Sequence, residues 1–392
     1  MSTEPVFEPN ATVLRERSLR AVLDALRAAP RRSRAELAER TGLSKPTVTS
    51  ALRALADGGL VRERGRTTGR RGPSASLFEP AAAAALVLAV DIGSHHVRAL
   101  IADLDGDTRG ETRIRVERPD AEHVLSAVRA ARSALTGAPV ELAVVGSPGV
   151  VDPVTGRIRS SPNIAGWEGA PAEVLLGDAL GVETVVENDV NLAALGELAS
   201  GGGRGRSSFA YLNVGSGLGA GLVLGGRLHR GRHGAAGEVG YLSLAAGAPV
   251  ERAGEKGPME QLLSQDAVVR AARAIDPAAP EDPRELFEMA RRGERLGRAV
   301  IAETVHALSS CIASITAVVD LELVLLGGGI GAQADLLLEP VRAATAALVP
   351  YAPEIECGAL GDHATLAGAV AVGTELALTA VIGRCLGSAR NP

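Results

Sequence analysis

Two stretches of this chain repeat one local pattern: an apolar strand, a glycine-rich loop, a second apolar strand and a glycine turn. The first stretch reads LVLAVDIGSHHVRALIADLDG from Leu86, and the second reads FAYLNVGSGLGAGLVLGGRLHRG from Phe209. A pattern that recurs in this way predicts two lobes built on one plan, with a cleft between them. A third glycine cluster, LVLLGGGIG at 323–331, follows a long amphipathic segment around 296–318. At 392 residues the chain can hold such a body and a further domain.

The first 60 residues predict three short helices. The first carries an apolar face at the spacing of a buried helix and ends before Pro30; its face consists of Leu19, Val22, Leu23 and Leu26. Ser33 and Glu36 form a capping-box pattern for a helix through Arg40. Gly42 suits a left-handed turn after it, and Ser44 caps a third helix with Pro46 in its first turn.

The third helix predicts a surface that reads DNA. Its core face would consist of Val48, Leu52 and Leu55, which leaves small polar and basic residues outside: Lys45, Thr47, Thr49, Ser50 and Arg53. The continuation GGLVRERGRTTGRRGPSASLFEP reads as strand, basic loop, strand, which is typical of a wing with Arg66, Arg70 and Arg71 near its tip. We therefore expect a winged helix-turn-helix over residues 1–80. The plainer alternatives are a helical hairpin and a solvated run of charge.

Charge and cysteine usage bound the class of protein. Residues 1–75 hold 15 basic and 8 acidic side chains, although the whole chain has a formal net charge of −5. A basic head on an acidic body is expected when one segment meets nucleic acid. Three widely separated cysteines without a CxxC pair favour a reducing cytoplasm over a disulfide framework or a metal site. The apolar run at 81–90 is too short to span a bilayer, so we expect no membrane partner.

The body resembles a known family through motifs that occur in its order. These motifs are GSPGVVDPVTGRIRSSPNIAGWEGAP, the run VVENDVNLAALGE, then VGSGLGAGLVLGGRLHRGRHGAAGEVGY, and finally LLGGGIG. The resemblance is to the ROK family of repressors, open reading frames and sugar kinases, and it covers about residues 86–380. It implies an α/β body at 81–392 with the two-lobed actin-like, ribonuclease H-like sugar kinase fold. With the winged head, the chain resembles the repressor branch.

The resemblance also implies a sugar pocket. In the kinases of the family the Asn-Asp pair holds the sugar, and these roles fall on Asn188 and Asp189. The Asp also accepts a proton from the attacking hydroxyl, so Asp189 would be catalytic only in a kinase. The alternative for this pair is a helix cap alone. Glu238, Tyr241 and Glu260 fall on the other sugar-contacting positions.

Two motifs depart from the family pattern. Tyr241, Glu251, Ala253 and Pro258 stand where a histidine and three cysteines ligate a structural zinc, so we expect no metal. His229 and His233 lie nearby, and we expect them in an exposed loop. The family loop DxGGT reads DIGSHHV here, which should hinder ATP, although Asp91 could still face a metal-bound water. The residues left for a nucleotide are Asp91, Gly93, Gly215, Gly217 and Gly328.

The sequence thus predicts a cytoplasmic DNA-binding regulator, a repressor of sugar uptake or catabolism genes, whose body binds a sugar or sugar derivative and requires no cofactor. Its expected partners are double-stranded operator DNA, the sugar and further copies of the chain in a homodimer or homotetramer. Two alternatives remain open. One is an ATP-dependent sugar kinase, and the other is an effector-independent regulator whose body only dimerises.

Overall fold

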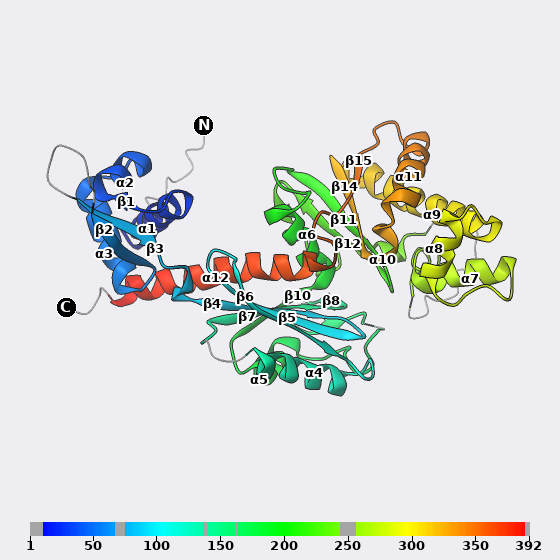
Figure 1. The fold of residues 1–392 in the computed structure, drawn as a ribbon, viewed down its shortest axis with the longest axis horizontal. Helices are drawn as coiled ribbons and strands as arrows, with labels where there is room; N and C mark the ends of the chain where they lie inside the picture. The colour runs from blue at the N-terminus through cyan, green and yellow to red at the C-terminus, as the bar shows by residue number, and fades with distance from the viewer. Residues whose placement is uncertain (1–10, 67–74, 136–138, 162, 244–255, 389–392) are drawn as a thin grey trace, which may run out of the picture.

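A computed structural model describes residues 11–66, 75–135, 139–161, 163–243 and 256–388. A small head and two α/β lobes follow one another along the longest axis of the molecule (Figure 1). The long helix α12 (Ala364–Ser388) runs from the interior of the body to the base of the head. The predicted class, a winged helix-turn-helix followed by a two-lobed sugar-kinase-like body, is confirmed.

The head consists of three helices and a three-stranded sheet. Its elements are α1 (Ala11–Ala28), β1 (Arg32–Ser33), α2 (Arg34–Thr41), α3 (Lys45–Asp57), β2 (Val61–Arg66) and β3 (Ser76–Pro80), with strand order β1-β3-β2. Ser33 and Glu36 make the predicted capping box, and Gly42 ends α2 with a φ of 68°. Ser44 accepts a hydrogen bond from the Thr47 amide at the start of α3. The local expectations for these helices are therefore correct.

The first lobe contains a five-stranded sheet in the order β10-β7-β4-β5-β6. Its strands are β4 (Leu86–Ile92), β5 (His96–Asp103), β6 (Thr108–Arg115), β7 (Leu142–Ser147) and β10 (Thr184–Asn188). One face packs against α4 (Ala121–Ala134) and α5 (Ala172–Leu180). The other packs against α12. Short elements η1 (Ala82–Ala84), β8 (Val150–Val151) and β9 (Ile158–Arg159) complete the lobe.

The second lobe repeats this plan in the order β13-β12-β11-β14-β15. Its strands are β11 (Ser208–Val214), β12 (Leu218–Leu224), β13 (Arg227–Leu228), β14 (Leu323–Gly327) and β15 (Glu354–Cys357). In both lobes an antiparallel meander of three strands is followed by two parallel strands on the other side of its first strand. The recurrence seen in the sequence therefore corresponds to two similar sheets.

The helices of the second lobe lie mainly on its outer face. They are α7 (Gln265–Ile275), α8 (Pro283–Arg291), α9 (Arg295–Val319) and α11 (Ala334–Leu348), with the short turns η2 (Val239–Tyr241), α10 (Gly328–Gly331) and η3 (Gly361–His363). Two segments, Arg295–Val319 and Gly361–Leu386, are long and apolar enough to cross a membrane. This is a weak indication, since core helices of soluble proteins meet the same criterion, and α9 buries Leu308, Cys311 and Ile312 in this lobe.

Helix α6 (Asp189–Ser200) connects the two lobes. It packs against α12 on the side of the first lobe and against β11 and β12 of the second. The contact with α12 is so close that a Cβ atom at Gly368 would overlap the Leu192 carbonyl, and one at Gly196 would overlap the Ala364 carbonyl. Only residues without a side chain fit at these two points. A layer formed by α6 and α12 thus lies between the two sheets.

Glu197 fixes the start of the C-terminal segment. Its carboxylate, fully buried on α6, accepts backbone hydrogen bonds from Gly202 (2.7 Å), Ala359 (3.2 Å) and Leu360 (3.0 Å). These donors lie beside α6 and just before η3 and α12. The buried acceptor therefore joins the helix between the lobes to the segment that leads to the head.

We expect Glu197→Ala to lower the free energy of unfolding by about 2–3 kcal/mol, because it leaves buried amide donors without an acceptor. Urea denaturation provides the measurement. Glu197→Gln retains one acceptor oxygen and should lose less. Equal stability of the Ala variant and the wild type would contradict this role for Glu197.

Candidate functional site

A pocket with a volume of about 140 Å³ opens between the two lobes. The first lobe contributes the loops after β4 and β7 and the start of α6. The second lobe contributes the β11–β12 turn and two glutamates. The polar residues that line the pocket are Ser94, Ser160, Asn163, Asn188, Asp189, Asn213, Ser216, Glu238 and Glu260. Hydroxyl, amide and carboxylate groups facing one small space suit a ligand with several hydroxyl groups.

Asn188 and Asp189 lie at the junction of β10 and α6. The Asn188 Oδ1 accepts a hydrogen bond from the Asn191 amide at 2.9 Å, and its Nδ2 donates to the Gly149 carbonyl at 3.1 Å and to Asp189 Oδ1 at 3.2 Å. Asp189 Oδ1 also accepts from the Val190 amide at 3.0 Å. Asn188 is thus a helix cap and part of the pocket wall at once, while its contact with a ligand stays a prediction.

The pocket concentrates carboxylates in a poorly hydrated place. Burial, followed by the charge of Asp91, raises the pKa of Asp189 to about 7. Burial and then the Glu260 charge raise the pKa of Glu238. Burial also raises the pKa of Glu260, against the opposing charge of Lys256. Hydrogen bonds from the hydroxyl groups of a ligand would stabilise the ionised form of these carboxylates, because they replace the hydration that burial removes.

Asp91 is held by an arginine and is not among the residues that line the pocket. Arg98, its partner across the β4–β5 hairpin, donates to Asp91 Oδ2 from Nε at 3.0 Å and from Nη2 at 2.6 Å. The side chain of Asp91 is 11% exposed and that of Arg98 is 21% exposed. Burial raises the pKa of Asp91, although the charge of Arg98 opposes this shift. Both Arg98 bonds go to Asp91 Oδ2, while the expected contact of Asp91 with a metal-bound water stays a prediction. The pairing disfavours a metal-nucleotide complex at this carboxylate.

The pocket brings together six of the predicted residues: Gly93, Asn188, Asp189, Gly217, Glu238 and Glu260. Tyr241 is 46% exposed at the end of η2 and is not among the lining residues. Gly215 and Gly328, in the β11–β12 turn and at the start of α10, also lie outside this lining. The predicted sugar role of Tyr241 therefore has no support from the geometry of the pocket.

Other lining residues were not predicted from the sequence, including Ser160, Asn163 and Asn213. Ser160 adopts a φ of 51°, which is rare for a residue with a side chain and is often found at functional sites. Asn213 follows the buried part of β11, as Asp91 follows that of β4. Asn213 could have been predicted from the sequence, because it is a polar residue at the end of a buried strand and precedes a glycine-rich loop.

This chain lacks the zinc ligands of the family pattern, and the described residues form no other metal site in their place. They contain no group of three or more His, Cys, Asp or Glu side chains that could hold a metal ion. Glu251 and Ala253 lie outside the described residues, while Pro258 is half-buried beside Met259. Tyr241, at the fourth position, is partly exposed to solvent.

The head presents the predicted surface of α3. Lys45, Thr49, Ser50 and Arg53 are exposed and Thr47 is half-buried. The Thr49 hydroxyl donates to the Lys45 carbonyl at 2.9 Å, while the Thr47 and Ser44 hydroxyls are 2.8 Å apart. Ser50 and Arg53 also face the C-terminal part of α12 across a second cavity.

The base of the wing is held by a buried carboxylate. Glu79 on β3 contacts Arg62 at 2.8 Å, Arg64 at 3.4 Å and Arg31 at 3.5 Å. Arg66 lies at the end of β2, where the wing leaves the sheet. Arg70 and Arg71 lie outside the described residues. The arginines at the base of the wing are thus tied to the head.

Comparison with known proteins agrees with this architecture. Residues 87–375 match the model of the ROK family, and residues 15–62 match that of winged helix-turn-helix DNA-binding domains. A putative xylose repressor of Caldicellulosiruptor sp. is 25% identical over 366 residues, which cover 87% of this chain and 91% of the relative. A glucokinase of Thermotoga maritima is 32% identical over 211 residues, or 50% of this chain and 67% of that enzyme.

Two solved structures show the same fold. A ROK family transcriptional regulator described as a homolog of the E. coli MLC protein superposes with a TM-score of 0.78 at 22% identity, covering 94% of this chain and 99% of that one. A ROK glucokinase from Streptomyces griseus, in complex with glucose and AMPPNP, gives a TM-score of 0.65 at 28% identity over 73% of this chain and 98% of the enzyme. The chain therefore belongs to the ROK family and carries a winged helix-turn-helix in front of the ROK domain.

Proposed function

We propose that this protein is a DNA-binding transcriptional regulator, a repressor of sugar uptake or catabolism genes, and that a sugar or sugar derivative binds between the lobes of its body. The head at 1–80 would bind operator DNA, and the body at 81–392 would bind the effector and a second copy of the chain. The alignment with repressor relatives over most of both chains supports this assignment. The two glucokinases match a smaller share of this chain, 50% and 73%.

The observation that carries this proposal is the double contact of α12. At its start, the Thr365 hydroxyl donates to the backbone carbonyl of Asp189 at 3.3 Å. Near its end, Leu378, Val381 and Ile382 share one apolar cluster with Leu19 and Leu23 of α1. A single helix therefore touches both the candidate sugar pocket and the core of the head. A change in the position of α6 can reach the head without crossing a flexible linker.

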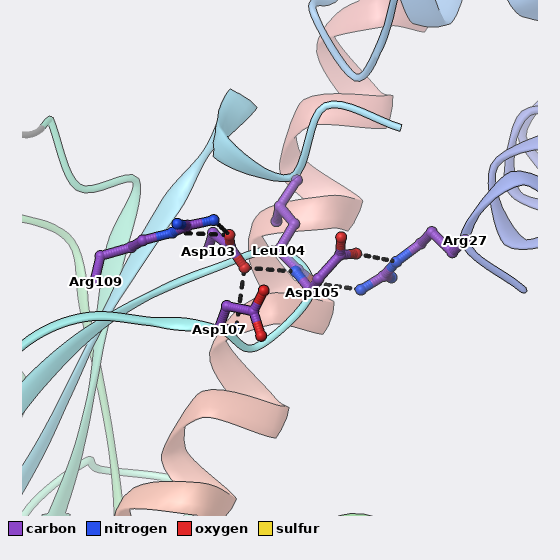
Figure 2. A network of polar contacts seen from close by, with 6 residues as sticks. All are labelled: Arg27, Asp103, Leu104, Asp105, Asp107 and Arg109. Carbon is purple, nitrogen blue, oxygen red and sulfur yellow. Dashed lines mark hydrogen bonds and ion pairs between the residues drawn. The ribbon is translucent and has the colours of Figure 1, made fainter. Parts of the chain in front are cut away.

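Polar contacts reinforce the joint between the head and the body. Arg20 on α1 donates to Glu375 at 2.5 Å and to Thr379 at 2.6 Å, both on α12. Arg27, at the end of α1, contacts Asp105 at 3.1 Å and the carbonyl of Leu104 (Figure 2).

The turn that receives Arg27 is itself held in place (Figure 2). Asp103, which is fully buried, accepts from the amides of Asp105 at 3.0 Å and Asp107 at 3.1 Å, and Arg109 pairs with its other oxygen. The buried carboxylate therefore fixes the β5–β6 turn before Arg27 reaches it. A fixed turn transmits a displacement of the first lobe to α1 better than a mobile loop would.

The effector half of the proposal is tested with the purified protein, its own upstream DNA and a panel of sugars. One sugar should change the operator affinity by about 5- to 150-fold, which is the usual range of allosteric coupling. The double variant Arg20→Ala/Arg27→Ala should bind that sugar as before and lose most of this change, because the joint is weakened. Arg17→Ala, an exposed arginine on α1, is the matched control. An operator affinity that no sugar alters would leave only a regulator whose body dimerises.

The raised pKa of Asp189 predicts a pH dependence of sugar binding. Because this pKa is about 7 in the folded protein, the carboxyl is mainly protonated at pH 6 and mainly ionised at pH 8. An ionised carboxylate accepts stronger hydrogen bonds from hydroxyl groups, so the sugar affinity should rise over this interval.

Calorimetric titration at several pH values measures this effect. Asp189→Asn should weaken sugar binding at pH 8 by about 10-fold, or about 1.4 kcal/mol, and should flatten the pH profile near 7. In the free protein the sign is opposite. Since the folded pKa lies above the ordinary value of 3.8, ionisation of Asp189 reduces stability as the pH rises between these two values. A variant with the wild-type pH profile would show that Asp189 does not contact the sugar.

A second candidate function is an ATP-dependent sugar kinase, since Asp189, Glu238 and Glu260 line one pocket as a sugar site requires. The Asp91–Arg98 pair disfavours it. We expect no phosphorylation of hexoses at high enzyme concentration, measured by release of ADP. Turnover that Asp189→Asn abolishes would establish the kinase function instead.

A further inference from the structure

A cavity of about 480 Å³ lies where the head meets the body. The head contributes α1 and the C-terminal half of α3, and the body contributes η1 and the last turns of α12. In Figure 1 the end of α12 lies directly beside α3. The polar residues of its lining are Arg15, Ser50, Arg53, Asp57, Arg384 and Cys385.

Close contact between α3 and α12 keeps the floor of this cavity in place. Gly58, which follows α3, lies so near the buried Cys385 that a Cβ atom there would overlap the sulfur. Val381 and Cys385 belong to the same apolar cluster as Leu52 and Leu55 of α3. The cavity is therefore a feature of the packed joint and not of two surfaces that happen to meet.

The lining is rich in guanidinium groups. Arg15, Arg53 and Arg384 come from three different helices, and Asp57 is the one carboxylate among the residues lining the cavity. Arg384 is oriented from outside by Glu141, with Nη1–Oε1 and Nη2–Oε2 distances of 2.5 and 3.0 Å. Its side chain is still 58% exposed.

This arrangement selects the chemistry of a ligand. Guanidinium groups bind phosphate through paired N–H donors, and the positive charges of Arg15, Arg53 and Arg384 disfavour a cation or an apolar molecule. Since Arg384 already pairs with Glu141 through Nη1 and Nη2, it contributes mainly its charge. Ser50 adds a hydroxyl that can bind a phosphate oxygen. The small residues Ala54 and Ala84 leave room for a tetrahedral group. Phosphate is thus the group that the lining fits.

We propose that this cavity is a phosphate-binding site shared by the head and the body, to which Arg384 of the C-terminal helix contributes. The phosphate is either that of the DNA backbone beside α3 or that of a free phosphate ester. Only the first source rests on the proposed DNA-binding function. In that case the surface that contacts DNA extends from the head onto the body. In the second case an occupied cavity covers Ser50 and Arg53, two residues of the surface that reads DNA.

The test compares Arg15→Ala and Arg384→Ala with Arg17→Ala, which removes an exposed arginine of α1 outside the cavity. Each full-length variant is titrated with operator and random duplexes at several salt concentrations by fluorescence anisotropy. Each is also titrated with inorganic phosphate by calorimetry, against chloride at equal ionic strength.

If the DNA backbone is the source, both cavity variants weaken binding to operator and random duplexes alike by about 3- to 10-fold and reduce the salt slope by about 1. If a free ester is the source, DNA binding stays as in the wild type, and the binding of inorganic phosphate falls at least about 5-fold, or about 1 kcal/mol. Loss of operator binding alone, with random duplexes unaffected, would count against phosphate recognition.

A further variant guards against a structural artefact. Glu141→Gln removes the carboxylate that pairs with Arg384 but leaves the positive charge of Arg384 in place. Phosphate binding should therefore be retained or strengthened. If both cavity variants match Arg17→Ala in the two titrations, the proposal is wrong. A failure of the wild type to bind any duplex would remove the regulator function, and the phosphate titration would still test the cavity independently.

Discussion

The contact between α6 and α12 is the constraint on which the rest of the body depends. Gly196 and Gly368 let the two helix backbones meet without side chains between them. On its other side, α6 meets β12 closely enough that a Cβ atom at Gly221 would contact the Ala194 side chain at 2.6 Å. One helix is thus packed tightly against both lobes. Since dense packing leaves little free space, a displacement of the second lobe must move α6 and α12 as well.

The electrostatics of the cleft separate two kinds of buried carboxylate. Asp91 has a fixed cation, Arg98, and is therefore satisfied within the protein. Asp189 and Glu238 have no such partner among their electrostatic neighbours, and burial raises the pKa of each. Asp91 is thus paired with a cation of the chain itself, while the pKa values of Asp189 and Glu238 are raised, as expected for buried carboxylates that lack such a cation.

Local patterns predicted the head well. The capping box at Ser33 and Glu36, the turn at Gly42 and the buried face of α1 each follow from a few neighbouring residues. The similar order of strands in the two lobes also followed from a repeated pattern. The role of α12 did not, because an apolar helix gives no sign of which distant surfaces it covers. The contacts of Arg20 with Glu375 and of Gly58 with Cys385 join residues more than 300 positions apart.

Some of the site lay within reach of the sequence. Once a hairpin around Gly93 was expected, its register would have set Arg98 opposite Asp91. The expectation for Tyr241 came from a family position, and a family position does not fix the direction of a different side chain. The pocket depends on the angle between two lobes, which no local pattern encodes.

The shared apolar cluster of α1 and α12 has a consequence for the order of synthesis. The head leaves the ribosome before the body, yet Leu378, Val381, Ile382 and Cys385, which cover the base of its core, are made only after the second lobe. The apolar base of the head therefore remains exposed to solvent while the two lobes of the body are translated. This apolar surface is buried only after the second lobe has been translated. A chain that stops before α12 therefore leaves the base of the head exposed to solvent.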